Sequence, residues 1–227
     1  MRRGLYKAIG GMKIKVCGMK HNIAEVAGLH PDYLGFIFWE GSPRYFDGDL
    51  PPLPASIKKV GVFVDAPQAT ILEKVRRYRL QLIQLHGNES PEFCNALRTA
   101  LKASAKGTGR IGIIKVFSIK GPFDFKRLQP YETACDYFLF DTKGALPGGN
   151  GFAFDWRLLE GYPSHKPYFL SGGIGPDELP QLRDFMQGPE ARYCHAVDVN
   201  SRFETEPGKK KAGSLTRFIE GVLQEDH

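Results

Sequence analysis

The sequence of 227 residues lacks several features that mark special classes of protein. It has no apolar run of about 18 residues, so it contains no candidate transmembrane helix. Its N-terminus has no apolar segment of the kind found in secretory signal peptides. Its four cysteines, at positions 17, 94, 135 and 194, form no CxxC pair, so the signatures of a zinc site and of a redox dithiol are missing. These absences predict a cytoplasmic protein with reduced cysteines.

The charge is only mildly unbalanced, with a formal net charge of +6. Half of this excess comes from Arg2, Arg3 and Lys7, within a stretch of eleven residues that has no acidic side chain. A second basic run covers residues 209–211. Neither run makes a long basic face with interleaved aromatic residues, which is the pattern typical of nucleic-acid binding. We therefore expect neither nucleic acid nor a membrane as a partner.

Short apolar runs alternate with amphipathic stretches along the chain. The runs are almost continuously apolar, as expected for strands of a parallel sheet that is covered on both faces. Helices are expected between them, and the proline-rich residues 46–56 are expected to form an extended loop or a broken helix. The eight predicted strands are Lys13–Cys17, Tyr33–Phe38, Lys59–Val64, Leu80–Leu85, Ile111–Phe117, Tyr137–Asp141, Tyr168–Leu170 and Ala196–Asn200. The predicted helical segments are Pro67–Arg77, Ser90–Lys102, Asp155–Leu159, Pro176–Phe185 and Ala212–Gln224, and the less regular Pro122–Gln129 has room for one or two helical turns.

Strands that alternate with helices indicate βαβ units and an α/β fold. Eight strands in a chain of this length favour a closed barrel over an open sheet. We predict a single-domain (β/α)8 TIM barrel over residues 12–227, preceded by a flexible extension over residues 1–11. Because the active site of such a barrel lies at the carboxyl ends of its strands, polar residues just beyond each run are the candidate functional residues.

Several short motifs stand at these strand ends, in a fixed order from Lys13 to the last helix. They are KVCGM, GFIF followed by SPR, VGVFV, QLHG, FLFDT followed by GGNG and FDW, LSGGI, and VDVNS followed by E..PG. Together they resemble the phosphoribosylanthranilate isomerase family over nearly the whole chain. That family has the (β/α)8 fold that the pattern of runs predicts independently.

The resemblance implies an enzyme of tryptophan biosynthesis, an aldose–ketose isomerase of the intramolecular oxidoreductase class. The implied reaction is an Amadori rearrangement of N-(5-phosphoribosyl)anthranilate to 1-(2-carboxyphenylamino)-1-deoxyribulose 5-phosphate. It requires a general acid, a general base and sites for a phosphate and a carboxylate. It requires no metal and no organic cofactor, so the expected partner is a small phosphorylated substrate. The sequence leaves open whether the protein is a monomer or a homodimer.

The resemblance places the general base at Cys17 and the general acid at Asp141. Without it, Cys17 would be interpreted as a small buried hydrophobic residue and Asp141 as a cap of its turn. Asp198, at another strand end, is the alternative acid, although a role in shaping the site is favoured. Lys15 should share the barrel face of Cys17, because side chains alternate along a strand.

The resemblance also implies the residues that bind the substrate. Arg44 corresponds to the arginine that contacts the anthranilate carboxylate, and Gly172, Gly173 and Ser201 correspond to the phosphate site. Arg202 stands where the family often has glycine, so it either adds charge to the phosphate site or points outward. His86 is a candidate for the pocket wall, with a structural role as the alternative. The glycine-rich loop over residues 147–151 either covers the site or is a plain connector.

Two other functions remain as alternatives. A related phosphoribosyl isomerase of the histidine pathway would have paired aspartates at the ends of strands one and five. Here strand one ends in Cys17, and strand five ends near Ser118 with no aspartate. A non-catalytic phosphate-binding barrel would tolerate the loss of Cys17 and Asp141, and both are present.

Overall fold

The computed structural model describes residues 12–104, 109–142 and 155–223. Its strands close into one parallel barrel in which each strand pairs with the next and β8 pairs with β1. The predicted (β/α)8 barrel is thus confirmed, and the strand bounds differ from the predicted ones by at most two residues. The strands are β1 (Lys13–Val16), β2 (Tyr33–Ile37), β3 (Lys58–Phe63), β4 (Leu82–Leu85), β5 (Gly112–Ile119), β6 (Tyr137–Thr142), β7 (Tyr168–Leu170) and β8 (Cys194–Val199).

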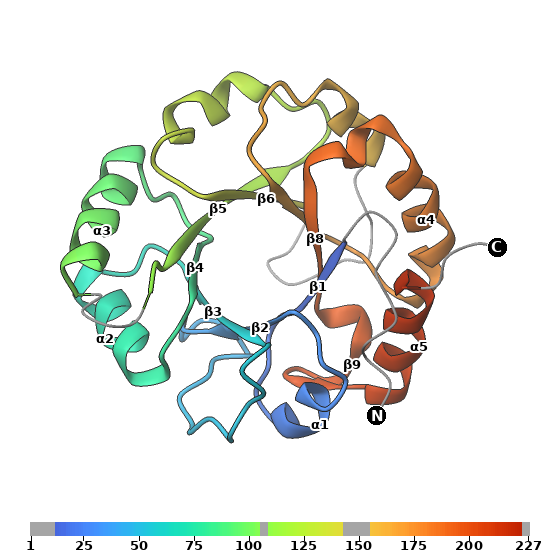
Figure 1. Cartoon of the computed structure of the whole chain (residues 1–227), viewed down its shortest axis with the longest axis horizontal. Coiled ribbons are helices and arrows are strands. Elements are labelled where there is room, and N and C mark those ends of the chain that lie inside the picture. Colours follow the sequence, from blue (N-terminus) through green and yellow to red (C-terminus); the bar gives the residue numbers. More distant parts are fainter. Residues whose placement is uncertain (1–11, 105–108, 143–154, 224–227) are drawn as a thin grey trace.

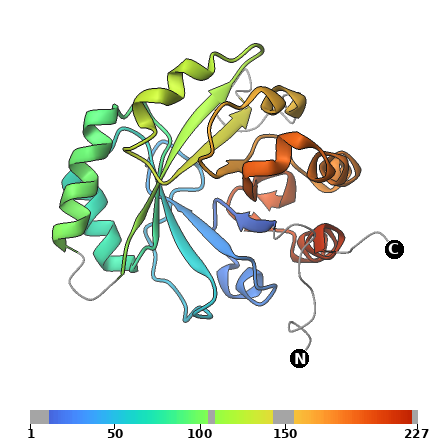
Figure 2. The same cartoon turned by 45° about the horizontal axis from the view of Figure 1, so that its top comes forward.

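The helices surround the barrel (Figures 1 and 2). The segments expected to be helical at residues 122–129 and 155–159 form 3-10 turns, η2 (Phe125–Tyr131) and η3 (Trp156–Gly161). The proline-rich residues 46–56 form a loop. The other helical elements are α1 (Ile23–Ala27), α2 (Gln68–Tyr78), α3 (Pro91–Ser104), η4 (Pro176–Glu178), α4 (Leu179–Gln187), η5 (Pro189–Tyr193), η6 (Ser201–Phe203) and α5 (Ala212–Leu223).

Two elements near the carboxyl ends of the strands were not expected from the sequence, and neither were the 3-10 turns η5 and η6. Helix α1 has only five residues, too few for a clear helical period. The small hairpin of β9 (Glu204–Glu206) and β10 (Lys209–Lys210) follows β8 and turns through Gly208, whose φ is +87°. Both elements lie beside the carboxyl ends of β1 and β8, where Lys20 and His21 donate backbone hydrogen bonds to Gly208.

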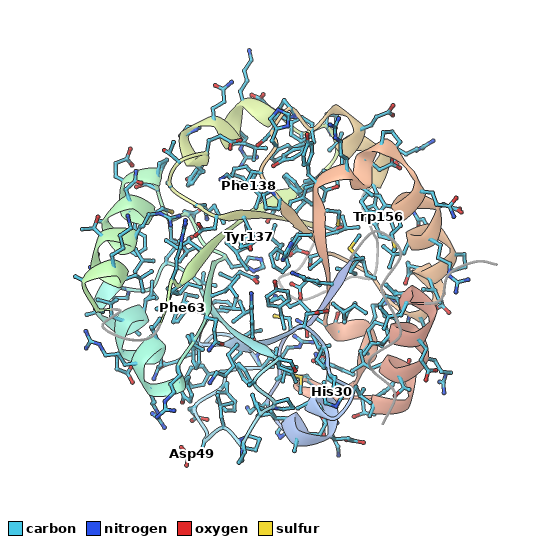
Figure 3. The ribbon with its side chains drawn as sticks, viewed as in Figure 1. His30, Asp49, Phe63, Tyr137, Phe138 and Trp156 are labelled. Atoms are coloured by element: carbon cyan, nitrogen blue, oxygen red, sulfur yellow. The ribbon has the colours of Figure 1, made fainter. Side chains whose placement is uncertain are left out.

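The core has two parts, one on each side of the strands. Figure 3 labels Tyr137 and Phe138, consecutive residues of β6 that point to opposite sides, with Tyr137 toward the barrel axis. Phe138 belongs to the larger apolar cluster between the strands and the helices. The smaller cluster fills the barrel itself and consists of Tyr33, Val60, Leu82, Ile114, Val116, Leu139, Phe169 and Ala196.

The inward-facing positions become polar toward the carboxyl ends of the strands. On β4, Leu82 belongs to the inner apolar cluster, and Gln84 and His86 follow at the next two inward positions. On β8, Ala196 is followed in the same way by Asp198 and Asn200. The apolar layer therefore closes the barrel below a polar layer, and this polar layer is the floor of the candidate site.

Two of the predictions concern residues outside the part of the chain that the structure describes. The extension over residues 1–11 and the glycine-rich loop over residues 147–151 both lie outside the described residues. Within the described ranges, none of the helices combines the length and the apolar character needed to cross a membrane.

The apolar layer inside the barrel yields a prediction about stability. Phe169 is fully buried, and its ring packs against the rings of Tyr33, Tyr137 and His195. Phe169→Ala should lower the free energy of unfolding by about 3–5 kcal/mol, because it leaves a cavity that the closed barrel cannot collapse to fill. Trp39→Ala is the control, because Trp39 is 40% exposed and its loss should cost less than about 0.5 kcal/mol. Urea unfolding measures both, and equal losses would contradict the assignment of this layer.

Candidate active site

A buried ion pair lies at the centre of the polar layer. Strands β1 and β8 pair in a register that sets Lys15 directly beside Asp198. The Lys15 Nζ atom lies 2.7 Å from Asp198 Oδ2 and 2.8 Å from Gln84 Oε1. Burial alone would lower the pKa of Lys15, but the neighbouring Asp198 and Cys17 raise it above its ordinary value. Lys15 is therefore a fully buried ammonium group of β1 that contacts Gln84 of β4 and Asp198 of β8.

Cys17 follows Lys15 on the inward face of β1, as predicted. Its thiol lies against Gly35 of β2, where a Cβ atom would come within 2.8 Å of Sγ. The thiol is buried, and this burial raises its pKa, while the ammonium of Lys15 opposes the shift through its charge and a hydrogen bond. The base position thus combines burial with the nearby ammonium groups of Lys15 and Lys210, whose charges both lower the pKa of the thiol.

Asp141 and His86 meet at the ends of β6 and β4. The Nε2 atom of His86 lies 3.4 Å from Asp141 Oδ2, and both side chains are partly open to solvent, at 33% and 24% exposure. The Nδ1 atom of His86 lies 3.2 Å from the Nε2 atom of Gln84. Asp141 is therefore connected to Lys15 through the side chains of Gln84, in β4, and of His86, directly after it.

The turn that follows β4 is fixed by a second buried ion pair. Glu89 accepts hydrogen bonds from the backbone N–H groups of Gly87 and Asp65. Lys115 of β5 lies 2.8 Å from Glu89 Oε2 and donates to the carbonyl of Gly87 at 2.7 Å. This clamp holds the backbone next to His86, and it lies outside the barrel, on the face of β5 opposite to Ile114 and Val116.

Arg44 lies beside the base rather than alone in its loop. Its Nε and Nη2 atoms donate to the carboxylate of Glu204 at 2.7–3.0 Å. Lys210 also donates to Glu204, at 2.6 Å, and to Asn200 at 2.7 Å. Burial would raise the pKa of Glu204, but its bonds to Arg44 and Lys210 lower it. A Cβ atom on Gly18 would come within 2.7 Å of Arg44 Cδ, so the Arg44 side chain passes next to the residue that follows Cys17.

The candidate phosphate residues lie at the ends of β7 and β8. Gly172 and Gly173 have φ values of +94° and +73°, which other residues rarely adopt. A Cβ atom on Gly172 would come within 2.3 Å of the Thr142 backbone, so a close approach also requires glycine there. Ser201 begins η6. Arg202 points to η4, where its Nη2 atom lies 3.3 Å from Glu178 and 3.7 Å from Asp177.

The structure brings most of the predicted residues together at the carboxyl ends of the strands. Direct contacts connect His86 to Asp141, and interactions through Lys15 connect Cys17 to Asp198. Sequence reasoning missed three residues that complete the site: Gln84, Glu204 and Lys210. Gln84 had a signal, because it lies two positions before His86 and so shares its face. Glu204 had one too, as the glutamate of the E..PG motif.

Comparisons with known proteins agree with this geometry. The family model described as N-(5'phosphoribosyl)anthranilate (PRA) isomerase matches residues 12–221. The isomerase of Parabacteroides distasonis is 42% identical over 220 residues, which cover 93% of this chain and 94% of the relative. The isomerase of Phocaeicola vulgatus is 39% identical and covers 94% of this chain and 98% of its own.

Solved structures of the same family have the same fold. The phosphoribosyl anthranilate isomerase of Thermotoga maritima superposes with a TM-score of 0.76 at 30% identity, covering 93% of this chain and 98% of that one. A structure of the isomerase in complex with reduced 1-(o-carboxyphenylamino)-1-deoxyribulose 5-phosphate gives a TM-score of 0.72 at 27% identity, with the same coverage.

These matches confirm the resemblance found in the sequence and exclude the two alternative functions. They extend over nearly the whole barrel and include all of the strand ends described above. The chain belongs to the N-(5'-phosphoribosyl)anthranilate isomerase family, and it is a phosphoribosylanthranilate isomerase of tryptophan biosynthesis.

Proposed function

We propose that this isomerase works by general acid–base catalysis, with Cys17 as the base and Asp141 as the acid. The observation that carries the proposal is the contrast between their surroundings. The Cys17 thiol is buried near the ammonium groups of Lys15 and Lys210, whereas the Asp141 carboxyl is partly open and faces a histidine. Two proton-transfer groups with such different surroundings suit two opposite roles.

The proposed reaction begins when Asp141 donates a proton to the ring oxygen of the substrate. The ring opens, and the C1 atom becomes a Schiff base with the anthranilate nitrogen. The Cys17 thiolate then removes the proton from C2, the electron pair of that bond forms the C1–C2 double bond of an enolamine, and the electron pair of the C1–N double bond returns to nitrogen. The C2 hydroxyl then loses its proton as C1 gains one from the thiol, which gives the aminoketose; the hydroxyl proton restores the acid form of Asp141. The step at C2 requires thiolate, which Lys15 stabilises against the effect of burial.

Asp198 suits a structural role better than the acid role that was its alternative. Its Oδ2 atom is taken by the Lys15 ammonium at 2.7 Å, and its side chain is only 5% exposed. Its Oδ1 atom is buried with no hydrogen-bond partner among the described residues. An acid that must meet the ring oxygen needs access to substrate, and Asp141 has the greater access of the two.

We further propose that Arg44 binds the anthranilate carboxylate. The Nε and Nη2 atoms of Arg44 donate hydrogen bonds to Glu204, and Nη1 has no partner among the described residues. The clamp by Glu204 fixes the plane of the guanidinium, and a planar, fixed guanidinium is suited to binding a carboxylate. Lys210 shares the charge of Glu204, so the site keeps a net positive charge for the anionic substrate.

The phosphate of the substrate is proposed to bind to the backbone around Gly172, Gly173 and Ser201. Positive φ angles and close packing at the glycine pair suit a turn whose N–H groups face an anion. Arg202 lies at the same end of the barrel, and its contact with Glu178 offsets a carboxylate that would otherwise repel the phosphate.

We also propose that the protein works in the cytoplasm, because its four cysteines are free, as is usual in a reducing compartment.

We propose that a single barrel carries the whole site, whether the protein is a monomer or a homodimer. The Thermotoga maritima relative is described as dimeric, in a structure of monomers generated from it.

Substitutions of the two catalytic residues test the assignment. Cys17→Ala and Asp141→Asn should each lower kcat by about 100- to 10,000-fold, the usual contribution of a positioned acid or base. The measurement is the loss of substrate fluorescence on turnover. Cys194→Ala is the matched control, because Cys194 lies at the opposite end of β8 and should leave kcat unchanged. Full turnover in either catalytic variant would refute the role of that residue.

Arg44→Lys tests the carboxylate site. A lysine keeps the charge but loses the planar double contact, so KM should rise about 10-fold or more while kcat changes less. Steady-state kinetics measure both constants. Arg157→Lys is the control, because Arg157 is exposed and pairs with Asp155 in the η3 turn. An unchanged KM in Arg44→Lys would show that the carboxylate binds elsewhere.

A further inference from the structure

A chain of polar contacts runs from Lys15 to Asp141, and its first two steps are hydrogen bonds with a fixed direction. The Lys15 ammonium can only donate, so the atom of Gln84 that it meets at 2.8 Å must be the carbonyl oxygen Oε1. The other end of the Gln84 amide is then its NH2 group, which also can only donate. This group faces His86 Nδ1 at 3.2 Å, so Nδ1 must accept and carries no proton.

This direction determines the state of the histidine. An imidazole whose Nδ1 accepts is neutral and carries its single proton on Nε2. The Nε2 atom is the one that faces Asp141 Oδ2, at 3.4 Å. The Nε2–H group is therefore the part of His86 nearest to Oδ2, and this polar contact favours the proton of the carboxylic acid on Oδ1.

We propose that Gln84 is a positioning residue for the acid: it holds His86 in the neutral Nε2–H tautomer, and His86 in turn directs the acidic proton of Asp141 to Oδ1. The proposal rests on the role of Asp141 as the acid. Neither residue transfers a proton to substrate. Their effect is that the acid keeps one orientation and one protonated oxygen in every turnover.

The neutral form of His86 is essential to this arrangement. An imidazolium next to Asp141 would stabilise the carboxylate and so remove the proton that the acid must deliver. A neutral N–H donor orients the carboxyl group without adding a full positive charge. Asp198 interacts electrostatically with both Lys15 and Asp141, and the Gln84 side chain lies between Lys15 and His86.

The origin of the direction is the burial of Lys15. A solvent-exposed amide could rotate and exchange its two ends at little cost. Here rotation of Gln84 would turn its NH2 group toward an ammonium group and its oxygen toward His86. Gln84 is 2% exposed and Lys15 is fully buried, so no bulk water compensates for such a mismatch.

The test is the tautomer of His86 in the resting protein, measured by long-range ¹H–¹⁵N NMR of ¹⁵N-histidine-labelled enzyme. The signals of His86 are assigned by their loss in His86→Gln. We expect a protonated Nε2 and an unprotonated Nδ1. An Nδ1–H tautomer or an imidazolium at neutral pH would overturn the proposal. His195 serves as an internal reference, because burial lowers its pKa to about 4 and keeps it neutral.

Variants of Gln84 connect the tautomer to catalysis. Gln84→Glu keeps an acceptor for Lys15 but offers a carboxylate to Nδ1, so it should move a proton to Nδ1 and lower kcat by about 10-fold or more. Gln84→Met removes the donor and should give a mixture of tautomers, with a fall in kcat and little change in KM. Unchanged tautomer and unchanged kcat in both variants would refute the proposal.

Two further comparisons separate this inference from the proposed function. Gln81→Met is the control, because Gln81 lies at the other end of the strand and binds the backbone of Lys59 and Arg79. It should alter neither the His86 signals nor kcat. If Asp141→Asn kept full turnover while His86 showed the expected tautomer, the acid assignment would fail and the hydrogen-bond direction would stand. If His86 showed another tautomer while Asp141→Asn was inactive, the acid assignment would stand and the hydrogen-bond direction through Gln84 would fail.

Discussion

The ion pair between Lys15 and Asp198 lies in the middle of the barrel, and the arrangement of the site depends on it. Removing two charges from water costs several kcal/mol for each ion, and a well-packed apolar pair would often be as stable. The pair therefore contributes little to the stability of the fold. What it supplies is a fixed cation at the point where β1, β4 and β8 face one another. The backbone register of β1 and β8 sets its position, so it is as rigid as the barrel.

This one cation acts on both sides of the site. Toward β1 it opposes, together with Lys210, the effect of burial on the pKa of the Cys17 thiol, so that a base can exist at a buried position. Toward β4 it sets the direction of the Gln84 amide and, through it, the proton position on His86. Arg44 is held in a similar way at the rim of the site, where the Glu204 carboxylate accepts hydrogen bonds from both Arg44 and Lys210. Glu204 thus fixes the orientation of Arg44, which is proposed to meet the substrate, and Gln84 fixes that of His86 behind the acid.

The sequence predicted the barrel well because each strand is a separate apolar run, and it predicted the candidate site because polar residues follow those runs. Alternation along β1 also placed Lys15 on the face of Cys17. Contacts between distant segments were beyond its reach. Arg44 and Glu204 are 160 residues apart, and their pairing depends on the hairpin after β8, which has two very short strands. The 3-10 turns η2 and η3 replaced short helices because a few residues carry no distinct helical period.

The thiolate of Cys17 and the direction of the hydrogen bonds through Gln84 both depend on the charge of Lys15. The measurement that tests it is the pH titration of the Lys15 side chain by NMR, with ¹⁵N or ¹³C labelling of lysine and assignment by a Lys15→Met variant. The account predicts an ammonium group throughout the neutral and mildly alkaline range, with a midpoint above the usual lysine value of about 10.4. A neutral amine at pH 7 would contradict it, because such a group could accept from the Gln84 amide, and the direction of the hydrogen bonds to His86 would no longer be fixed.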